Sequence, residues 1–189
     1  MILYLHGFRS APASFKANLL SQHLAARGLL GQWLCPQLPA SPREAIALCL
    51  APAEPHRAGL TLIGSSLGGY YATWLAEQLQ CKAVLLNPAV HAERDLATQV
   101  GEHRMYHSAE PFVFRPEYVD ELAAIKVQRI TRPERYFLVA ATGDEVLDWR
   151  EMRDHYPGAR QLIIQGSDHG LSDFARWMPQ VLAFAGLND

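Results

Sequence analysis

The segment from residue 60 to residue 79 constrains the fold of this chain more than any other. An apolar run at 60–63 leads directly into Gly64-Ser65-Ser66-Leu67-Gly68, a G-x-S-x-G pattern with Ser66 at its centre. The pattern is typical of a strand that turns sharply into a helix, where the serine backbone is strained and the flanking positions must be small. The Ser66 hydroxyl is then expected at the positive end of the helix. A glycine-rich turn with no catalytic role fits the pattern as well, so other parts of the sequence are needed to distinguish a catalytic serine from a structural turn.

Strands and helices are expected to alternate along the chain. Short apolar runs predict strands at 2–5, 32–35, 60–63, 83–86, 136–141 and 160–164. Helical spacing and end signals predict helices at 13–27, 42–50, 67–79, 148–156 and 173–187. Such regular alternation predicts parallel βαβ units, with helices on both faces of the sheet. We therefore expect one α/β domain over residues 1–189.

Four residues are typical of helix ends. Ser41, Asp148 and Asp173 each precede a predicted helix and are expected to cap its first turn. Gly28 follows the first predicted helix, at a position where glycine commonly ends one.

The stretch 89–133 interrupts the alternation, because it is far longer than the usual connection between consecutive strands. One interpretation is a cap over the carboxyl ends of the strands, where binding crevices lie in parallel sheets. The other is a set of surface helices that only cross the sheet. His103 and His107 are four residues apart and could share a face of such a helix, which would suit two metal ligands. No third ligand is evident in the sequence, so we expect no metal site there.

Composition excludes several classes of protein. Seventeen basic and nineteen acidic residues give a net charge of −2, so no electrostatic attraction to nucleic acid or an anionic membrane is expected. No apolar run approaches the roughly 20 residues that span a bilayer. The opening residues lack the basic lead and long apolar core of a signal peptide. Cys35, Cys49 and Cys81 fit neither a disulfide framework nor a zinc site, and we expect reduced thiols in a cytoplasmic protein.

A serine nucleophile requires a base and an acid that orients it. In enzymes with this turn, the acid and then the histidine follow the serine in sequence, each after a strand. Asp144 follows the predicted strand at 136–141, and His169 follows the one at 160–164. Glu145 is the alternative acid, but Asp144 comes directly after the tight Gly143 turn. Asp168 is expected to point away from the adjacent imidazole.

The first strand ends in Leu5-His6-Gly7-Phe8, which predicts donors for a negatively charged oxygen. The backbone N–H groups of Phe8 and Leu67 would form this oxyanion hole, since Leu67 begins a helix and Gly7 permits close approach. We expect His6 to brace the loop, because it precedes the serine in the chain. Arg9 is expected to be an exposed loop residue, with contact to the substrate as the alternative.

Several segments together resemble a known family. They are 3–5, 7–8, 36–39, the block 64–75, Asn87-Pro88-Ala89-Val90, Thr142-Gly143-Asp144-Glu145-Val146-Leu147-Asp148 and His169. On these segments, which span nearly the whole chain, the sequence resembles the YqiA-like small bacterial esterases of the α/β-hydrolase superfamily. The resemblance implies a three-layer α/β-hydrolase fold with a reduced, mostly parallel sheet of about six strands and a cap-like insertion. It also implies serine esterase activity on acyl esters and acyl thioesters, without a metal or an organic cofactor.

The sequence therefore predicts a serine hydrolase that forms an acyl-serine intermediate with a small-molecule ester or thioester. Ser66, Asp144 and His169 are the expected catalytic residues, and Phe8 and Leu67 the expected oxyanion donors. The same residues would also serve a thioesterase, an acyltransferase or a peptidase. A catalytically silent, hydrolase-like binding protein is the alternative outside enzymes. A carbon–carbon lyase or dehalogenase shares the scaffold, but a dehalogenase would have aspartate in place of Ser66.

Overall fold

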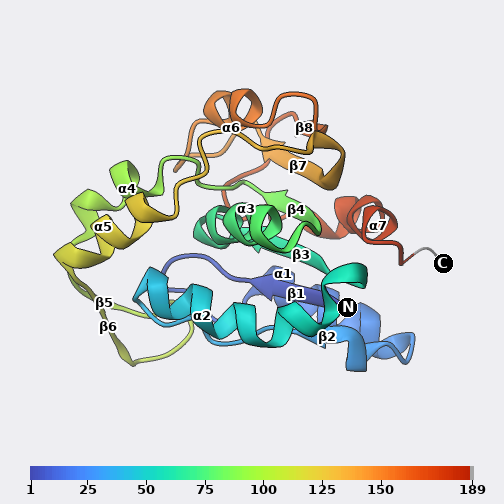
Figure 1. Ribbon diagram of the computed structural model, residues 1–189, viewed down its shortest axis with the longest axis horizontal. Coiled ribbons are helices and arrows are strands. Elements are labelled where there is room, and N and C mark those ends of the chain that lie inside the picture. Colours follow the sequence, from blue (N-terminus) through green and yellow to red (C-terminus); the bar gives the residue numbers. More distant parts are fainter. Residues whose placement is uncertain (188–189) are drawn as a thin grey trace.

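A computed structural model describes residues 1–187 and contains a central parallel sheet of six strands (Figure 1). The strands lie side by side in the order β2-β1-β3-β4-β7-β8, and each neighbouring pair is parallel. Their bounds are β1 (Ile2–Leu5), β2 (Trp33–Leu34), β3 (Thr61–Ser65), β4 (Lys82–Leu86), β7 (Tyr136–Ala141) and β8 (Arg160–Ile164). This arrangement confirms the predicted α/β class.

Helices cover both faces of the sheet and so make three layers (Figure 1). Side chains alternate between the faces along each strand, and β1 shows the division. Ile2 and Tyr4 pack with α1 (Phe15–Ala26) and α7 (Phe174–Phe184). Leu3 and Leu5 pack on the opposite face with α2 (Pro42–Ala53), α3 (Leu67–Leu79) and α6 (Trp149–His155). The sheet is thus buried between two apolar clusters.

Most predicted elements are present, with differences at their ends. The second strand is reduced to Trp33–Leu34, and β3 extends to Ser65, directly before the turn. Short 3-10 helices connect the elements at Leu30–Gln32, Glu54–Gly59, Ala97–Gln99 and Pro133–Arg135. No helix within residues 1–187 is both long and apolar enough to cross a membrane.

Three of the four predicted helix-end residues act as expected. Ser41 and Asp148 accept hydrogen bonds from the N–H groups of Glu44 and Arg150, at 3.2 and 2.8 Å. Gly28 follows Arg27, the C-cap of α1, and has a φ of +69°, a conformation that suits glycine. The prediction for Asp173 was wrong. Its carboxylate accepts hydrogen bonds from the side chains of Ser167 and Trp177 instead of an N-terminal backbone N–H.

The segment between β4 and β7 holds a small hairpin between two helices. The elements are α4 (Ala92–Asp95), the antiparallel strands β5 (Gly101–Arg104) and β6 (Pro111–Phe114), and α5 (Pro116–Ala124). His103 lies in β5, paired with Phe112, and His107 lies in the hairpin turn. The two histidines therefore do not share a helix face. Their segment pairs as strands because β6, Pro-Phe-Val-Phe, offers an apolar β partner.

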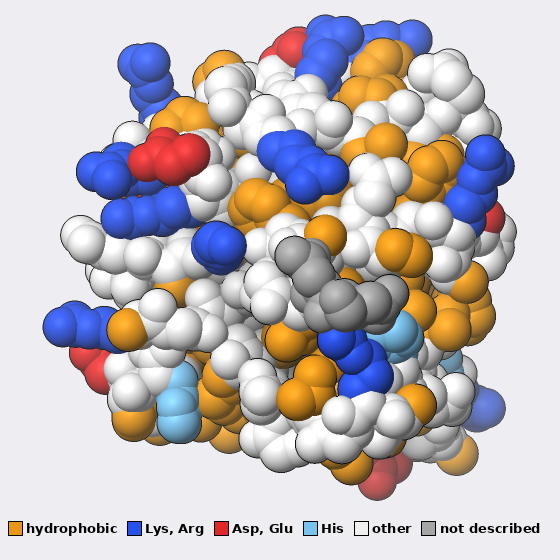
Figure 2. Space-filling model, turned by 90° about the vertical axis from the view of Figure 1, so that its right-hand side faces the viewer, with side chains coloured by type: hydrophobic (Ala, Val, Ile, Leu, Met, Phe, Trp, Pro, Cys, Tyr) orange, Lys and Arg blue, Asp and Glu red, His pale blue; other side chains and the backbone are white. Residues whose placement is uncertain are grey.

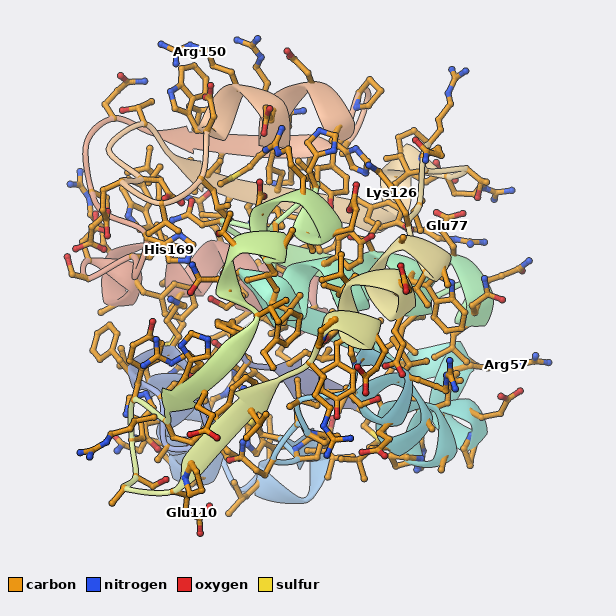
Figure 3. The ribbon with its side chains drawn as sticks, turned by 90° about the vertical axis from the view of Figure 1, so that its left-hand side faces the viewer. Arg57, Glu77, Glu110, Lys126, Arg150 and His169 are labelled. Carbon is orange, nitrogen blue, oxygen red and sulfur yellow. The ribbon has the colours of Figure 1, made fainter. Side chains whose placement is uncertain are left out.

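The hairpin and its flanking helices lie at one end of the sheet, away from the two chain termini (Figure 1). Figure 2 shows the side nearer the termini, where basic side chains are dispersed among apolar and uncharged ones. Figure 3 looks onto the hairpin side, where His169 is labelled above the hairpin and Glu110 at its lower end.

Candidate active site

The turn after β3 has the strained geometry that the sequence pattern predicts. Ser66 has φ 54° and ψ −121°, and α3 begins at the next residue. A Cβ on Gly64 would lie 2.3 Å from the carbonyl oxygen of Gly68, and a Cβ on Gly68 would lie 2.0 Å from that of Leu5. The strand and the helix therefore pass each other at a separation that only glycine permits. Close packing holds Ser66 in this conformation.

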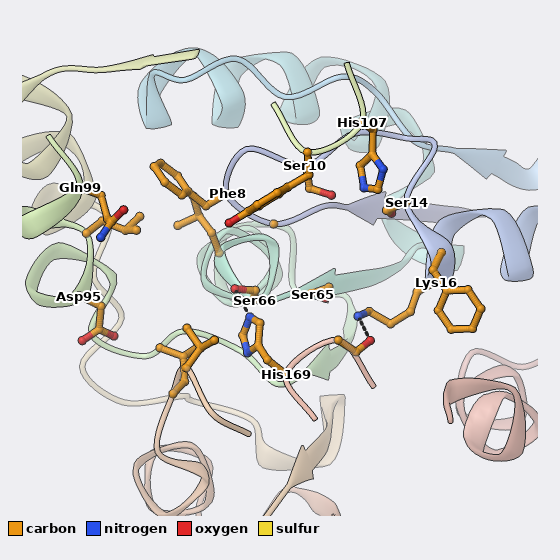
Figure 4. Close-up of a pocket in the computed structure, with 18 of the residues that line it drawn as sticks. Phe8, Ser10, Ser14, Lys16, Ser65, Ser66, Asp95, Gln99, His107 and His169 are labelled. Atoms are coloured by element: carbon orange, nitrogen blue, oxygen red, sulfur yellow. Dashed lines mark hydrogen bonds between the residues drawn. The ribbon is translucent and has the colours of Figure 1, made fainter. Parts of the chain in front are cut away.

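The structure brings Ser66, Asp144 and His169 together at the carboxyl edge of the sheet. Nε2 of His169 lies 3.0 Å from Oγ of Ser66, and Nδ1 lies 2.8 Å from Oδ2 of Asp144. The three residues follow β3, β7 and β8, and parallel strands end at the same edge. Figure 4 shows the imidazole directed at the Ser66 hydroxyl.

The carboxylate of Asp144 is buried and fully hydrogen-bonded. Its side chain has no exposed surface, and Oδ1 accepts from the N–H groups of Val146 and Leu147 at 2.8 and 2.9 Å. An ionised carboxylate only accepts hydrogen bonds, so the ring proton of His169 belongs on Nδ1. Nε2 then presents its lone pair to the Ser66 hydroxyl, as a general base requires.

The two rival carboxylates have other roles. Glu145 accepts the backbone N–H of His169 at 3.0 Å, so it holds the main chain of the histidine and not its ring. Asp168 faces away from the imidazole, because its carboxylate accepts the N–H of Ser172 at 2.9 Å. Hydrogen bonds from Ser172 lower the pKa of Asp168, which keeps it ionised.

Asn87 is a positioning residue that the sequence analysis did not single out. It is fully buried at the end of β4. Its side-chain NH₂ donates to the carbonyl oxygens of Asp168 and His169, each at 3.0 Å, and its Oδ1 accepts the Ala141 N–H at 2.8 Å. One amide thus ties the end of β7 to the histidine loop. The sequence held one sign of this role: Asn87 is a polar residue directly after a buried strand, at the carboxyl edge of the sheet where Ser66 and His169 lie.

The predicted oxyanion residues lie beside Ser66. A Cβ on Gly7 would lie 3.3 Å from Cβ of Ser66, so the loop after β1 packs directly against the serine. Leu67 is the first residue of α3, and the first N–H groups of a helix have no acceptor within it. The ring of Phe8 packs edge-on against Phe112 and Phe114 of the hairpin, with centroids 5.1 and 5.3 Å apart.

His6 and Arg9 support this loop. Nε2 of His6 accepts the N–H of Leu38 at 3.0 Å, and Nδ1 lies 3.0 Å from the Gly7 carbonyl oxygen. Burial lowers the pKa of His6, so the neutral ring that these bonds require is favoured. Arg9 donates to the carbonyl oxygen of Arg104 at 2.8 Å, and its guanidinium lies over the Tyr106 ring. Arg9 therefore ties the loop to the hairpin.

A pocket of about 660 Å³ surrounds Ser66 and His169 (Figure 4). The segment 89–133 contributes part of its wall, so this segment faces the pocket. The contributing residues are Asp95, Leu96, Gln99, Tyr106 and His107.

Neither a metal cluster nor a disulfide is present in the part of the chain that the structure describes. No three His, Cys, Asp or Glu side chains within residues 1–187 are arranged to hold a metal ion. The three cysteines are free thiols, and burial raises the pKa of each, which favours the protonated form.

A parallel sheet with a strained serine turn after β3, and with an acid and a histidine after β7 and β8, defines the α/β-hydrolase fold. Residues 1–186 match the family described as the uncharacterised protein family UPF0227. The chain belongs to this family, which confirms the resemblance to the YqiA-like group.

Solved structures share the fold at low sequence identity. Est1E from Butyrivibrio proteoclasticus, with ferulic acid bound, is 14% identical with a TM-score of 0.72, covering 96% of this chain and 85% of its own. The α/β hydrolase domain-containing protein 10 from mouse is 15% identical with a TM-score of 0.71, covering 96% and 89%. The esterase domain of a Rhodothermus marinus protein is 22% identical with a TM-score of 0.62, covering 96% and 83%. These similarities show the fold.

Proposed function

We propose that this protein is a serine hydrolase that cleaves carboxylic esters through an acyl-serine intermediate. The observation that carries the proposal is the continuous chain of hydrogen bonds from Ser66 through His169 to Asp144. Each member has the chemistry its place requires: a hydroxyl nucleophile, an imidazole base and a buried carboxylate. Structural relatives described as an esterase domain and as Est1E with ferulic acid support ester substrates.

The geometry implies a sequence of proton transfers. His169 takes the Ser66 proton at Nε2 while Oγ attacks the ester carbonyl, and Asp144 stabilises the imidazolium. The backbone N–H groups of Phe8 and Leu67 stabilise the oxyanion, each contributing about 3–4 kcal/mol. His169 then gives its proton to the leaving alkoxide, and an acyl-Ser66 remains. Water attacks this ester with His169 again as base, which releases the acid and restores the hydroxyl.

Ser66, His169 and Asp144 do not by themselves determine which acyl donor or which acceptor reacts. Acyl thioesters would pass through the same acyl-serine, and so would amide or acyl-transfer substrates. A substrate panel that includes oxygen esters, acyl thioesters and anilides is therefore part of the test. We expect hydrolysis of the oxygen esters.

The central experiment combines labelling and substitution. A fluorophosphonate probe should modify Ser66, as mapped by mass spectrometry of the labelled peptide. Ser66→Ala should abolish labelling and lower kcat on a p-nitrophenyl ester at least about 10³-fold, with an unchanged circular dichroism spectrum. Ser65→Ala, at the preceding serine, is the matched control and should retain labelling. Unchanged turnover in Ser66→Ala, or a label on another residue, would contradict the proposal.

A further inference from the structure

A buried lysine that the proposed mechanism does not use lines the active-site pocket. Lys16 is the second residue of α1 and is only 9% exposed. Its Nζ donates to the carbonyl oxygen of Gly170 at 2.5 Å, and Gly170 directly follows His169. The ammonium group therefore lies beside the loop that carries the base. Figure 4 shows Lys16 on one side of the Ser66–His169 pair, within the same pocket.

The charge of Lys16 is incompletely compensated. The partner at hydrogen-bond distance is a neutral carbonyl, while Asp168 and Asp144 act on Lys16 only through longer-range electrostatics. The hydrogen bonds of these carboxylates go to Ser172 and to His169, and neither carboxylate forms an ion pair with Lys16. Burial lowers the pKa of Lys16 to about 8, so the ammonium form still predominates at neutral pH, at a cost in solvation. An anion at this site would offset that cost.

The N-terminal end of α1 adds to the positive potential at the same place. The first turn of α1 contains no acidic residue, and the side chain of its N-cap residue, Ser14, makes no capping hydrogen bond. The Ser14 hydroxyl oxygen is buried and approaches the phenol of Tyr4, but it has no well-formed hydrogen-bond partner among residues 1–187. Ser14 and Lys16 both line the pocket. A helix N-terminus, a cation and an available hydroxyl together favour a bound anion.

The opposite side of the pocket has a different character. Phe8, Gln99 and Asp95 lie across the Ser66–His169 pair from Lys16 (Figure 4), and the apolar Leu96 and Leu147 also line the wall. The Asp95 carboxylate lies 2.8 Å from Arg94, which also forms an ion pair with Glu151, so this side of the pocket is acidic and does not attract an anion. Among the described residues, Lys16 is the one lysine or arginine that lines this pocket.

We propose that the ester substrate carries a carboxylate, which Lys16 and the N-terminal end of α1 bind beside the reacting centre. This inference rests on the proposed esterase function and specifies its substrate class. Lys16 and Ser66 line the same pocket, so a carboxylate bound at Lys16 and an ester at Ser66 can belong to one small molecule. It belongs either to the far end of the acyl chain or to the leaving alcohol.

Two substrate pairs distinguish these positions. Mono-4-nitrophenyl adipate and 4-nitrophenyl hexanoate differ by a carboxylate at the end of the acyl chain. Ionised 3-acetoxybenzoate and its methyl ester differ by a carboxylate on the leaving group. For each ester, kcat/KM is first divided by the rate constant for its hydrolysis by hydroxide, which corrects for intrinsic reactivity. We define the selectivity as the ratio of this corrected kcat/KM for the anionic ester to that for the neutral ester of the same pair. The wild-type selectivity should exceed one in one of the pairs.

Substitutions then assign the selectivity to Lys16. Lys16→Met should lower it at least tenfold, mainly through a higher KM for the anionic ester, and Lys16→Arg should retain most of it because the charge remains. Lys82→Met is the matched control, since Lys82 also donates to a backbone carbonyl but does not line the pocket. Its selectivity should equal that of the wild type.

Three results would overturn the proposal. The wild type could show no selectivity for the anionic ester in either pair, a result that requires no variant to fold. Lys16→Met could lower kcat/KM for both esters of a pair equally, as expected if Lys16 only holds the Gly170 loop. Lys16→Arg could lose selectivity as completely as Lys16→Met while keeping the wild-type melting temperature.

A binding measurement separates this inference from the esterase function. Monomethyl adipate and 3-acetoxybenzoate should each be titrated into Ser66→Ala by calorimetry, because that variant should bind ester without turnover. At least one of these two carboxylates should bind to Ser66→Ala. The same compound should bind at least tenfold more weakly to the double variant that combines Ser66→Ala with Lys16→Met. If the protein neither turns over esters nor reacts with the probe, but binds a carboxylate in a way that depends on Lys16, only the esterase function is rejected. Turnover of neutral esters with no binding of either carboxylate would reject the carboxylate site alone.

Discussion

The side-chain NH₂ of Asn87 donates to the carbonyl oxygen of His169 at 3.0 Å, across 82 residues of sequence. The same amide also bonds Asp168 and the Ala141 backbone. The position of the imidazole therefore depends on an amide at the end of β4 as well as on its own strand. A buried amide with all these partners satisfied is rigid, and removing it leaves several backbone groups without partners.

Asn87→Ala tests this relationship. The variant leaves the N–H of Ala141 and two carbonyl groups unpaired in a buried place, so the free energy of unfolding should fall by at least about 2 kcal/mol. Turnover should also fall, in kcat more than in KM, because His169 loses its support. Urea unfolding and ester kinetics measure both quantities. Asn18→Ala, which removes an exposed amide bonded to the Ala13 carbonyl, should change neither. Wild-type kcat in Asn87→Ala would show that this amide does not position the histidine.

The choice between the two adjacent carboxylates is tested by amide substitutions. Asp144→Asn should lower kcat at least about 10²-fold, because an amide neither stabilises the imidazolium nor favours the required tautomer. Glu145→Gln should cost less than tenfold, since the glutamine oxygen can still accept the His169 N–H. Both effects are read from kcat on one p-nitrophenyl ester. A larger loss in Glu145→Gln than in Asp144→Asn would reverse the assignment.

The close approach of α3 to β1 predicts an intolerance to a single methyl group. Gly68→Ala places a Cβ 2.0 Å from the carbonyl oxygen of Leu5, where only backbone movement relieves the clash. We expect the free energy of unfolding to fall by at least about 3 kcal/mol, together with loss of turnover. In Gly59→Ala the added Cβ meets no atom within 4 Å, and its stability should change by less than about 0.5 kcal/mol. Equal urea midpoints for the two variants would refute this account of the turn.

The buried His6 predicts a dependence of stability on pH. Burial lowers its native pKa below the ordinary value of 6.5. Below about pH 6.5 the unfolded chain therefore binds a proton that the native ring does not, and the free energy of unfolding falls with acidification. Above that pH the contribution of His6 is constant. Burial also lowers the pKa of His155, which acts in the same direction.

Urea unfolding at pH 7.5 and pH 5.5 measures this effect. His6→Gln keeps a side-chain acceptor but removes the titration, so its loss of stability between the two pH values should be smaller than that of the wild type. His56→Gln, at an exposed position, should show the wild-type loss. An identical loss in His6→Gln and the wild type would mean that His6 is not the titrating group.

Strong local patterns explain why most of the fold was predictable from sequence. The helix over residues 67–79 and the strands at 136–141 and 160–164 have the predicted bounds, because periodicity and turn residues agree there. The hairpin at 101–114 was missed, since a strand of polar and charged residues such as β5 carries no alternating apolar signal. Asp173 was misassigned because the side chains of Ser167, before the helix, and Trp177, within it, take up its carboxylate.

The residues proposed for catalysis were selected from their order after predicted strands, and the structure places Ser66, Asp144 and His169 within hydrogen-bond distance. Asn87 and Lys16 were not selected. Their significance depends on burial against segments far away in the sequence, 82 residues for Asn87 and 154 for Lys16. Such pairings have no local signature, and a lysine near a helix start is ordinarily exposed.

Phe8 contacts the hairpin that forms part of the pocket wall, so a change in the hairpin would affect both the shape of the pocket and the position of Phe8. The residue proposed to supply an oxyanion donor is held by Phe112 and Phe114, and its neighbour Arg9 is bonded to the backbone at Arg104. Grafting a different hairpin onto this scaffold would therefore not only reshape the pocket but also disturb the donor itself. Changes to the side chains of Val146 and Leu147, which line the pocket outside the hairpin, should therefore disturb the donor less than changes within the hairpin.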